Sequence, residues 1–156
     1  MLRYQEQYSE LTLHEGIEEF YSVNKEFAEL LETEGKNGLF FQHDITHVIF
    51  GLDSSIEQEH LLDTWALWGT RFKWKIIRGY FKHPAIKQIY KDIKKDLGAW
   101  GITKKVILMI PLKILIIFRA LRMKKKWDYH NITNEQLNTK LSDIRKEYNI
   151  NVFIPS

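Results

Sequence analysis

The chain has 156 residues, of which 44% are hydrophobic and 28% are charged, and it contains no cysteine. This length suits one domain around a single core, and the apolar fraction excludes an intrinsically disordered chain. The lack of cysteine excludes disulfides, thiolate metal sites and a cysteine nucleophile, so a metal site would have to use imidazole and oxygen ligands.

The net charge of +3 is distributed unevenly along the chain. Residues 1–70 contain three basic and fourteen acidic side chains, whereas residues 71–126 contain seventeen basic side chains against Asp92 and Asp96. We therefore expect one strongly positive region of surface, which suits an anionic partner. The alternative is that these lysines and arginines are ordinary solvated helix faces.

The sequence predicts an all-α fold, a single-domain helical bundle of about five or six helices spanning residues 1–156. The first helix should begin at a capping box of Thr12 and Glu15 and carry an apolar stripe. The second is predicted over residues 39–50 and should end at Gly51, because glycine adopts a left-handed conformation at little cost.

The third helix should begin at a second capping box, Ser54 with Glu57, and continue through the tryptophans near residue 68. A fourth helix is predicted from the break at Pro84 to Gly98. The last should be capped by Thr133 and run to Tyr148, and the terminal letters INVFI suggest one short strand.

Residues 106–118 are apolar except for Pro111 and Lys113. A bilayer span needs roughly 20 apolar residues, so this stretch is too short to cross one, and the proline should interrupt the helix. One interpretation is a central core helix with Lys113 reaching outward. The other is a helix at a membrane interface, or the wall of a lipid channel, whose basic flanks meet anionic headgroups.

The stretch WGTRFKWKIIRGYFKH, residues 68–83, interleaves aromatic and basic side chains. It could bind single-stranded nucleic acid by stacking and phosphate contacts, or form the buried side of a helix with lysine stems reaching outward. Its basic residues could equally contact a phosphate or carboxylate of a lipid or ring precursor. Because no nucleic-acid-binding motif is present, nucleic acid is the minor alternative.

The stretch FQHDITHVIFGLDSSIEQEH, residues 41–60, contains the polar residues most suited to a site. On a helix, His43 and His47 lie one turn apart on the same face, where two imidazoles can reach one cation. Asp44 points about 100° away around the helix axis, from which it could ligate or could orient a histidine.

Glu59 would complete this site if the third helix packs back against the second. Two imidazoles and a carboxylate would then leave a coordination position open for water or substrate. The alternative is an unliganded histidine pair, with Asp44 supporting a histidine and Glu59 favouring a helix N-terminus. The pattern also differs from the H-E-x-x-H zincin motif.

The run His43-Asp44-Ile45-Thr46-His47, followed after eleven residues by Glu59, resembles the HDxxH-(eleven)-E motif of a coenzyme Q biosynthesis family, that of the fourth Coq protein. The letters FGL at residues 50–52 and the following aromatic helix are also similar, so the resemblance covers about residues 39–72. The His-Asp doublet is shared with HD-domain phosphohydrolases too. Those also need an upstream histidine and a distant aspartate, for which the chain offers His14 and Asp92 or Asp128.

The coenzyme Q resemblance implies a mostly helical fold and a divalent metal at the combined metal and catalytic residues His43, Asp44, His47 and Glu59. The metal is usually taken to be zinc in that family, and the donor set also suits magnesium, manganese or iron. The resemblance further implies a prenylated ring substrate. The family has been assigned an oxidative decarboxylation of that ring and a scaffold role in the biosynthetic complex.

We therefore expect a metal-dependent protein of ubiquinone biosynthesis that binds a prenylated quinone precursor at an anionic membrane surface, with oxidative decarboxylation of the ring as its candidate reaction. The alternative is a non-catalytic isoprenoid-lipid-binding or scaffold protein of a quinone-biosynthesis complex. A homodimer is a further candidate assembly. The N-terminus resembles no signal peptide, so the expected location is cytoplasmic, as in a bacterial-type chain, with peripheral membrane association.

Overall fold

The computed structural model describes residues 1–25, 27–29, 39–71, 84–128 and 130–152. Within these ranges the chain is all-α, as predicted, with isolated β-bridges and no β-strand. The helical elements are η1 (Arg3–Gln5), α1 (Leu13–Val23), α3 (Leu39–Phe50), α4 (Ile56–Gly69), α6 (Pro84–Leu108), α7 (Ile110–Leu121), α8 (Asn134–Leu137) and α9 (Leu141–Tyr148).

The helices outnumber the predicted five or six because short elements escape a periodicity argument. The predicted C-terminal helix is divided into α8 and α9, because the chain between them pairs with the segment before α1 through an antiparallel bridge of Thr12 and Lys140. The expected strand INVFI is absent over residues 150–152, and its remaining residues lie outside the described ranges.

Side-chain caps fix where several helices begin. Thr12 and Thr133 each accept the backbone N–H three residues further on and form the predicted capping boxes. At α4 the prediction was wrong by one position: Ser55 is the N-cap, and the hydroxyl of Ser54 donates to the side chain of Asn24 instead. Glu59 lies in the first turn of α4.

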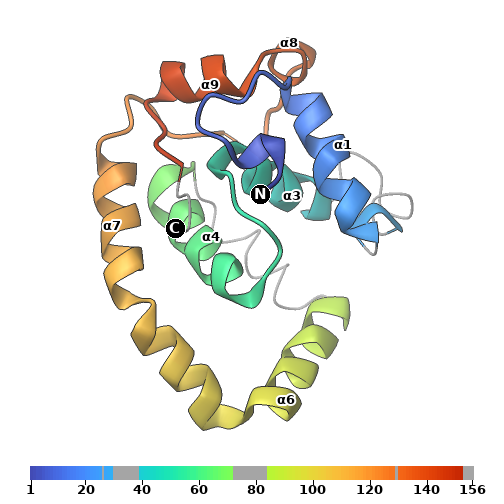
Figure 1. Cartoon of the computed structure of the whole chain (residues 1–156), viewed down its shortest axis with the longest axis vertical. Coiled ribbons are helices and arrows are strands. Elements are labelled where there is room, and N and C mark those ends of the chain that lie inside the picture. The colour runs from blue at the N-terminus through green and yellow to red at the C-terminus, as the bar shows by residue number, and fades with distance from the viewer. Residues whose placement is uncertain (26, 30–38, 72–83, 129, 153–156) are drawn as a thin grey trace.

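α6 and α7 form a long bent arm: α7 and the adjoining part of α6 run along one edge of the molecule, and the first part of α6 turns back at the lower end (Figure 1). The arm bends at Gly98, where φ is 63° and ψ is 169°, and breaks before Pro111, which lies in the first turn of α7. Both breaks were predicted. No helix in the described part of the chain is long and apolar enough to cross a membrane.

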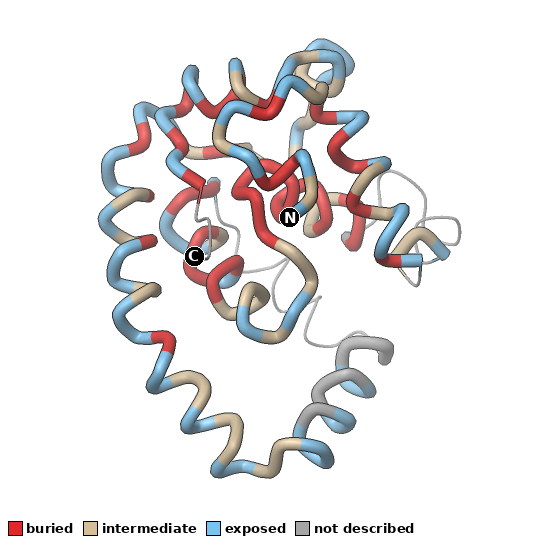
Figure 2. The backbone as a smooth tube through the Cα atoms, viewed as in Figure 1, coloured by how far each residue is buried: buried red, intermediate tan, exposed pale blue. Residues whose placement is uncertain are grey.

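The arm is not the central core helix of a bundle, which was one of the two expectations for residues 106–118. Only one face of α7 is buried, and that face packs chiefly against α4 (Figure 2). The core lies mainly among α1, α3, α4 and α9, and α7 contributes Ile116 and Ala120 to it. Within it the ring of Trp65 stacks on Phe50 with centroids 4.4 Å apart.

Gly16 lets α1 approach α3 closely. A Cβ at this position would lie 2.8 Å from Val48 and 2.9 Å from Leu141, distances that packed side chains do not tolerate. This approach brings Phe20 and Tyr21, one turn further along α1, against the middle of α3.

The fully buried guanidinium of Arg145 joins three parts of the chain. It donates to the carbonyls of Val48 (2.7 Å) and Ile49 (3.0 Å), which belong to the last turn of α3, and to the carbonyls of Tyr4 (2.7 Å) and Glu6 near the N-terminus. Carbonyls of a last helical turn have no partner within the helix, so Arg145 caps α3. Burial lowers the pKa of Arg145 to about 10, so the side chain stays charged at neutral pH.

We predict that Arg145→Met lowers the free energy of unfolding by about 3 kcal/mol or more, because it leaves buried carbonyls without donors. Equilibrium denaturation in urea measures this change. Arg122→Met is the matched control, since Arg122 is exposed and should change stability by less than about 0.5 kcal/mol. Equal stabilities of the two variants would contradict the assigned cap.

Candidate metal centre

The two histidines of the candidate site come from the buried middle of α3 and lie one turn apart, as predicted. Their imidazole centroids are 4.8 Å apart with an interplanar angle of 71°. The helix ends just beyond them at Gly51, where φ is +70°. There the N–H of Leu52 donates to the carbonyl of His47 (2.9 Å) and that of Gly51 to the carbonyl of Val48 (3.3 Å), the pattern of a Schellman cap.

The turn after α3 brings Glu59 of α4 back beside both imidazoles, as the sequence predicted. Its Oε1 lies 3.1 Å from Nε2 of His47, and its Oε2 lies 3.5 Å from Nε2 of His43. One donor atom from each of these three residues falls within 4.8 Å of the others. We call His43, His47 and Glu59 the histidine–glutamate group.

His47 is the most deeply buried member of this group. It is 0% exposed, and its ring stacks on Phe20 with centroids 5.2 Å apart. Neither ring nitrogen makes a hydrogen bond to any described residue; the oxygen of Glu59 is near Nε2 but is not aligned as a hydrogen bond. Buried polar atoms are seldom left without partners, so these nitrogens indicate a missing ligand or water.

The donor set fits a divalent cation. Two imidazole nitrogens and one carboxylate form the ligand set of a common class of catalytic zinc site, which keeps its fourth position open. Ligands of one tetrahedral zinc, each roughly 2.1 Å from the ion, lie about 3.4 Å apart. The separations of 3.1 and 3.5 Å from Glu59 to the two imidazoles are already close to that value.

The charges within the group favour a cation or protons. Burial of His43 opposes protonation, but the nearby carboxylates of Glu59 and Asp44 outweigh it and raise the pKa of His43 to about 10. Burial also opposes the charged form of Glu59, which would raise its pKa, but the electrostatic interaction with the two histidines lowers this pKa overall. A divalent cation would replace these protons, because imidazole ligates in its neutral form.

Asp44 lies on the other side of His43. Its Oδ1 is 3.5 Å from Nδ1 of His43, whereas Glu59 faces Nε2 of that ring. The carboxylate is fully buried, and its Oδ2 accepts a hydrogen bond of 2.8 Å from the hydroxyl of Tyr21. Burial and the neighbouring Asp44 both raise the pKa of Tyr21, which remains a neutral donor. In this position Asp44 orients the His43 ring.

Two neighbours of the site were missed by the sequence argument. Tyr21 was assigned only to the apolar stripe of its helix, and nothing in the sequence links it to Asp44. Asp63 follows Glu59 by one helical turn, a spacing that could have identified it. Burial and the negative charge of Glu59 raise the pKa of Asp63, while His43, His60 and Lys113 act to lower it.

Other candidates for a polar site lie elsewhere. His14, Asp92 and Asp128 each interact with a neighbour of their own, and none of them belongs to the histidine–glutamate group. The aromatic and basic stretch considered for nucleic acid lies outside the described residues from residue 72 to residue 83. Comparisons with protein-family models, curated proteins and solved structures found no match.

We predict that His47→Ala abolishes stoichiometric binding of zinc, because it removes the buried donor of the group. Elemental analysis after dialysis against zinc measures the loss. His14→Ala is the matched control, since His14 is an exposed histidine on α1 and should leave one zinc per chain. Glu59→Gln changes a partly exposed side chain and tests the same site should His47→Ala fold poorly. Full zinc content in both site variants would contradict the assignment.

Tyr21→Phe should weaken zinc binding by about tenfold, because supporting hydrogen bonds behind a ligand typically contribute that much. Competition with a chromophoric chelator measures the dissociation constant. Tyr8→Phe, at a residue that is 82% exposed, should leave it unchanged. An unaltered affinity in Tyr21→Phe would show that Asp44 needs no support from α1.

Proposed function

We propose that this chain binds a divalent metal ion, zinc in the first instance, through His43, His47 and Glu59 and acts in quinone biosynthesis on a prenylated ring precursor at a membrane surface. The observation that carries the proposal is the fully buried His47, whose ring nitrogens make no hydrogen bond to a described residue and lie beside two further donors. The ring substrate and the pathway come from the motif resemblance.

The bound ion would supply Lewis-acid polarisation of a phenol or carboxylate oxygen of the ring. The chain's own residues hold that position: α3 presents the two imidazoles, α4 presents Glu59, and Asp44 with Tyr21 fixes the ring of His43. Three protein donors leave room for an oxygen of the substrate, which supports a chemical role over a purely structural metal.

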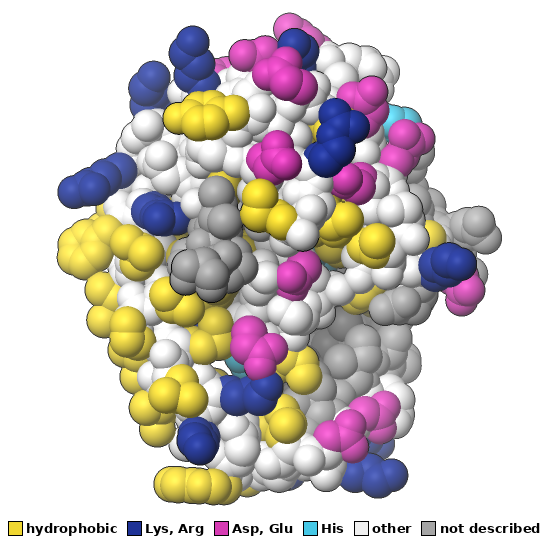
Figure 3. All heavy atoms as spheres, viewed as in Figure 1, with side chains coloured by type: hydrophobic (Ala, Val, Ile, Leu, Met, Phe, Trp, Pro, Cys, Tyr) yellow, Lys and Arg dark blue, Asp and Glu magenta, His cyan; other side chains and the backbone are white. Residues whose placement is uncertain are grey.

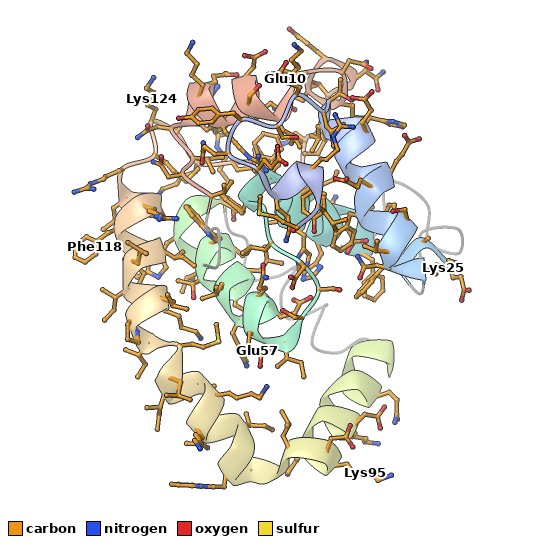
Figure 4. All side chains as sticks on the ribbon, in the orientation of Figure 1. Glu10, Lys25, Glu57, Lys95, Phe118 and Lys124 are labelled. Carbon is orange, nitrogen blue, oxygen red and sulfur yellow. The ribbon has the colours of Figure 1, made fainter. Side chains whose placement is uncertain are left out.

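The membrane part of the proposal is supported by the outer face of the arm. Figure 3 shows hydrophobic side chains gathered along this edge of the molecule, over α7 and the adjoining part of α6. The exposed members are Trp100, Ile107, Leu108, Ile110, Ile114, Leu115, Phe118 and Leu121. We call these eight residues the apolar ridge; Phe118 points away from the rest of the molecule (Figure 4).

Exposed basic side chains accompany the apolar ridge: Lys104 lies between Trp100 and Ile107 in the chain, and Arg122 and Lys124 follow Leu121. A contiguous apolar surface with basic edges suits the boundary between acyl chains and anionic headgroups. Lys125 and Lys126 contribute less than the sequence suggested. Lys125 pairs with Glu147, and Lys126 donates to the carbonyls of Trp68 and Ala120.

The resemblance extends the proposal to oxidative decarboxylation of the ring. In that reaction a hydroxyl group replaces the ring carboxylate, so carbon dioxide leaves and a two-electron oxidant such as dioxygen must be supplied with the substrate. Release of carbon dioxide together with ring hydroxylation of a ring-carboxylated, prenylated precursor by the metal-loaded chain under dioxygen, lost in Glu59→Gln, would support this reaction. Metal-dependent binding of the precursor without release would favour the alternative, a lipid-binding or scaffold protein of a quinone-biosynthesis complex.

We predict that the double variant Leu115→Ser with Phe118→Ser reduces co-sedimentation with vesicles containing anionic lipid by about tenfold, since two large apolar side chains no longer enter the lipid. Both residues are exposed, so the fold should be retained. Tyr8→Ser, an exposed aromatic away from the arm, is the control. Undiminished sedimentation would remove the membrane role, and loss of a dimer by the double variant in light scattering would assign the ridge to a second copy.

A further inference from the structure

The bend in α6 is made by one glycine that lies in open space. The backbone of Gly98 has φ of 63° and ψ of 169°, a non-helical conformation inside an otherwise helical segment. A Cβ at this position would meet no atom within 4 Å, so packing does not require a glycine here. Residues with a Cβ rarely adopt this conformation, so the bend itself depends on the conformational freedom of glycine.

The part of α6 before the bend, residues 84–97, is less firmly joined to the rest of the molecule than the part after it. Among the side chains that the structure describes in this range, only Gln88 and Asp92 form a hydrogen bond, and they form it with each other. After the bend, Lys105 pairs with Glu57 of α4. The arm is thus anchored on one side of the bend, and a change of backbone conformation there would move residues 84–97 as a unit.

The apolar and aromatic residues of α6 keep one helical register through the bend. At about 100° per residue, a straight α6 would carry them within one sector of about 100°. They are Ile86, Ile89, Tyr90, Ile93, Leu97, Trp100, Ile107 and Leu108. The structure describes the backbone of the first four and not their side chains, so their register follows from spacing alone. The last three are exposed members of the apolar ridge, so straightening at Gly98 would extend the ridge along the whole of α6.

A bent and a straight α6 would differ in their affinity for a membrane. In water, a straight α6 would expose a continuous apolar face about 37 Å long, which is unfavourable, whereas a bilayer would bury this face. In the bent arm the two parts of α6 diverge, so one flat surface cannot contact both along their length (Figure 1). A ligand that binds one conformation better shifts the equilibrium toward it, so a membrane would favour the straight form.

The charged residues of α6 suit an anionic bilayer. Exposed Lys87 and Lys94 would border the apolar sector of a straight helix, at the level of lipid headgroups. Lys104 is the one charged residue within the sector, and its stem can lie on an apolar surface while its ammonium reaches the headgroups. A second copy of the chain is a less suitable partner, because a coiled-coil seam is narrow and continuous. The exposed apolar face of α7 is broader than such a seam, and Pro111 interrupts the arm.

We propose that α6 straightens at Gly98 when the chain binds an anionic bilayer, so that the apolar ridge is extended by residues 84–97 and the bent arm is the form present in water. This inference rests on the membrane part of the proposed function and does not depend on the metal centre or on the ring substrate. The glycine acts as a hinge between two conformations of one helix, and the bilayer selects the straight one.

The test measures the separation of two spin labels placed on either side of the hinge. The chain has no cysteine, so Lys87→Cys and Thr103→Cys, both at exposed positions, provide the only labelling sites. Paramagnetic resonance should report a shorter separation in water. On vesicles of phosphatidylcholine and phosphatidylglycerol it should lengthen toward about 24 Å, the rise of roughly 16 helical residues. An unchanged separation in vesicle-bound chain would overturn the inference.

Gly98→Ala provides a second test in the same labelled chain. Alanine disfavours the bent backbone and favours a helix, and the open space around the position accommodates its Cβ. We expect the fraction of straight arm in water to rise about fivefold. Lys95→Ala, at an exposed residue of the same helix (Figure 4), is the control and should leave the separation unchanged. The absence of any rise in Gly98→Ala would contradict the hinge.

Co-sedimentation with the vesicles is measured on every sample first, so that the two proposals can fail separately. A chain that does not sediment with anionic vesicles overturns the membrane part of the proposed function together with this inference. Sedimentation with an arm that stays bent overturns the inference alone. Straightening that increases with protein concentration in the absence of vesicles would also overturn it, because the apolar stripe would then belong to a contact with a second copy.

Discussion

The position of the candidate site depends on how the end of α3 is held. Arg145 reaches from α9 through the core to the carbonyls of Val48 and Ile49, directly after His47 in the chain, and to carbonyls near the N-terminus. Four backbone carbonyls, rather than a carboxylate, surround its charge. The guanidinium acts there only as a hydrogen-bond donor. This cap holds the end of α3, and α1 holds its middle. The positions of the two imidazoles are therefore fixed independently of α4, which supplies the third donor.

The polar groups of the site lower the stability of the fold unless a ligand binds to them. His47 occupies a core position next to Phe20, and neither of its nitrogens forms a hydrogen bond within the described part of the chain. His43 and Glu59 keep charge in a largely enclosed place. An apolar side chain at position 47 would satisfy the packing without this cost. Local conflicts of this kind are expected at functional sites, where stability is given up for binding.

Sequence reasoning recovered what depends on spacing along one or two helices. The histidine pair, its turn at Gly51 and the return of Glu59 follow from helical periodicity and glycine chemistry, and the breaks at Gly98 and Pro111 follow in the same way. Contacts made between distant elements could not be predicted, because single-sequence patterns carry no information about which helix faces which. The hydrogen bond from Tyr21 to Asp44 and the cap from Arg145 are of this kind, as is the bridge at Lys140 that divides the last helix.

The two faces of α7 suggest how the proposals would be combined in one molecule. A helix that is apolar almost all round normally lies inside a core or against lipid, whereas α7 buries one face against α4 and exposes the other. The helix is about 10 Å across with its side chains, so lipid at the apolar ridge would lie only about that far from the inner face, which packs against α4. A prenyl chain leaving the membrane beside the ridge would thus stay near apolar side chains while its ring approaches α4, the helix that carries Glu59. On this view the candidate metal centre would distinguish one ring from another, whereas the ridge provides attraction that any isoprenoid tail would share.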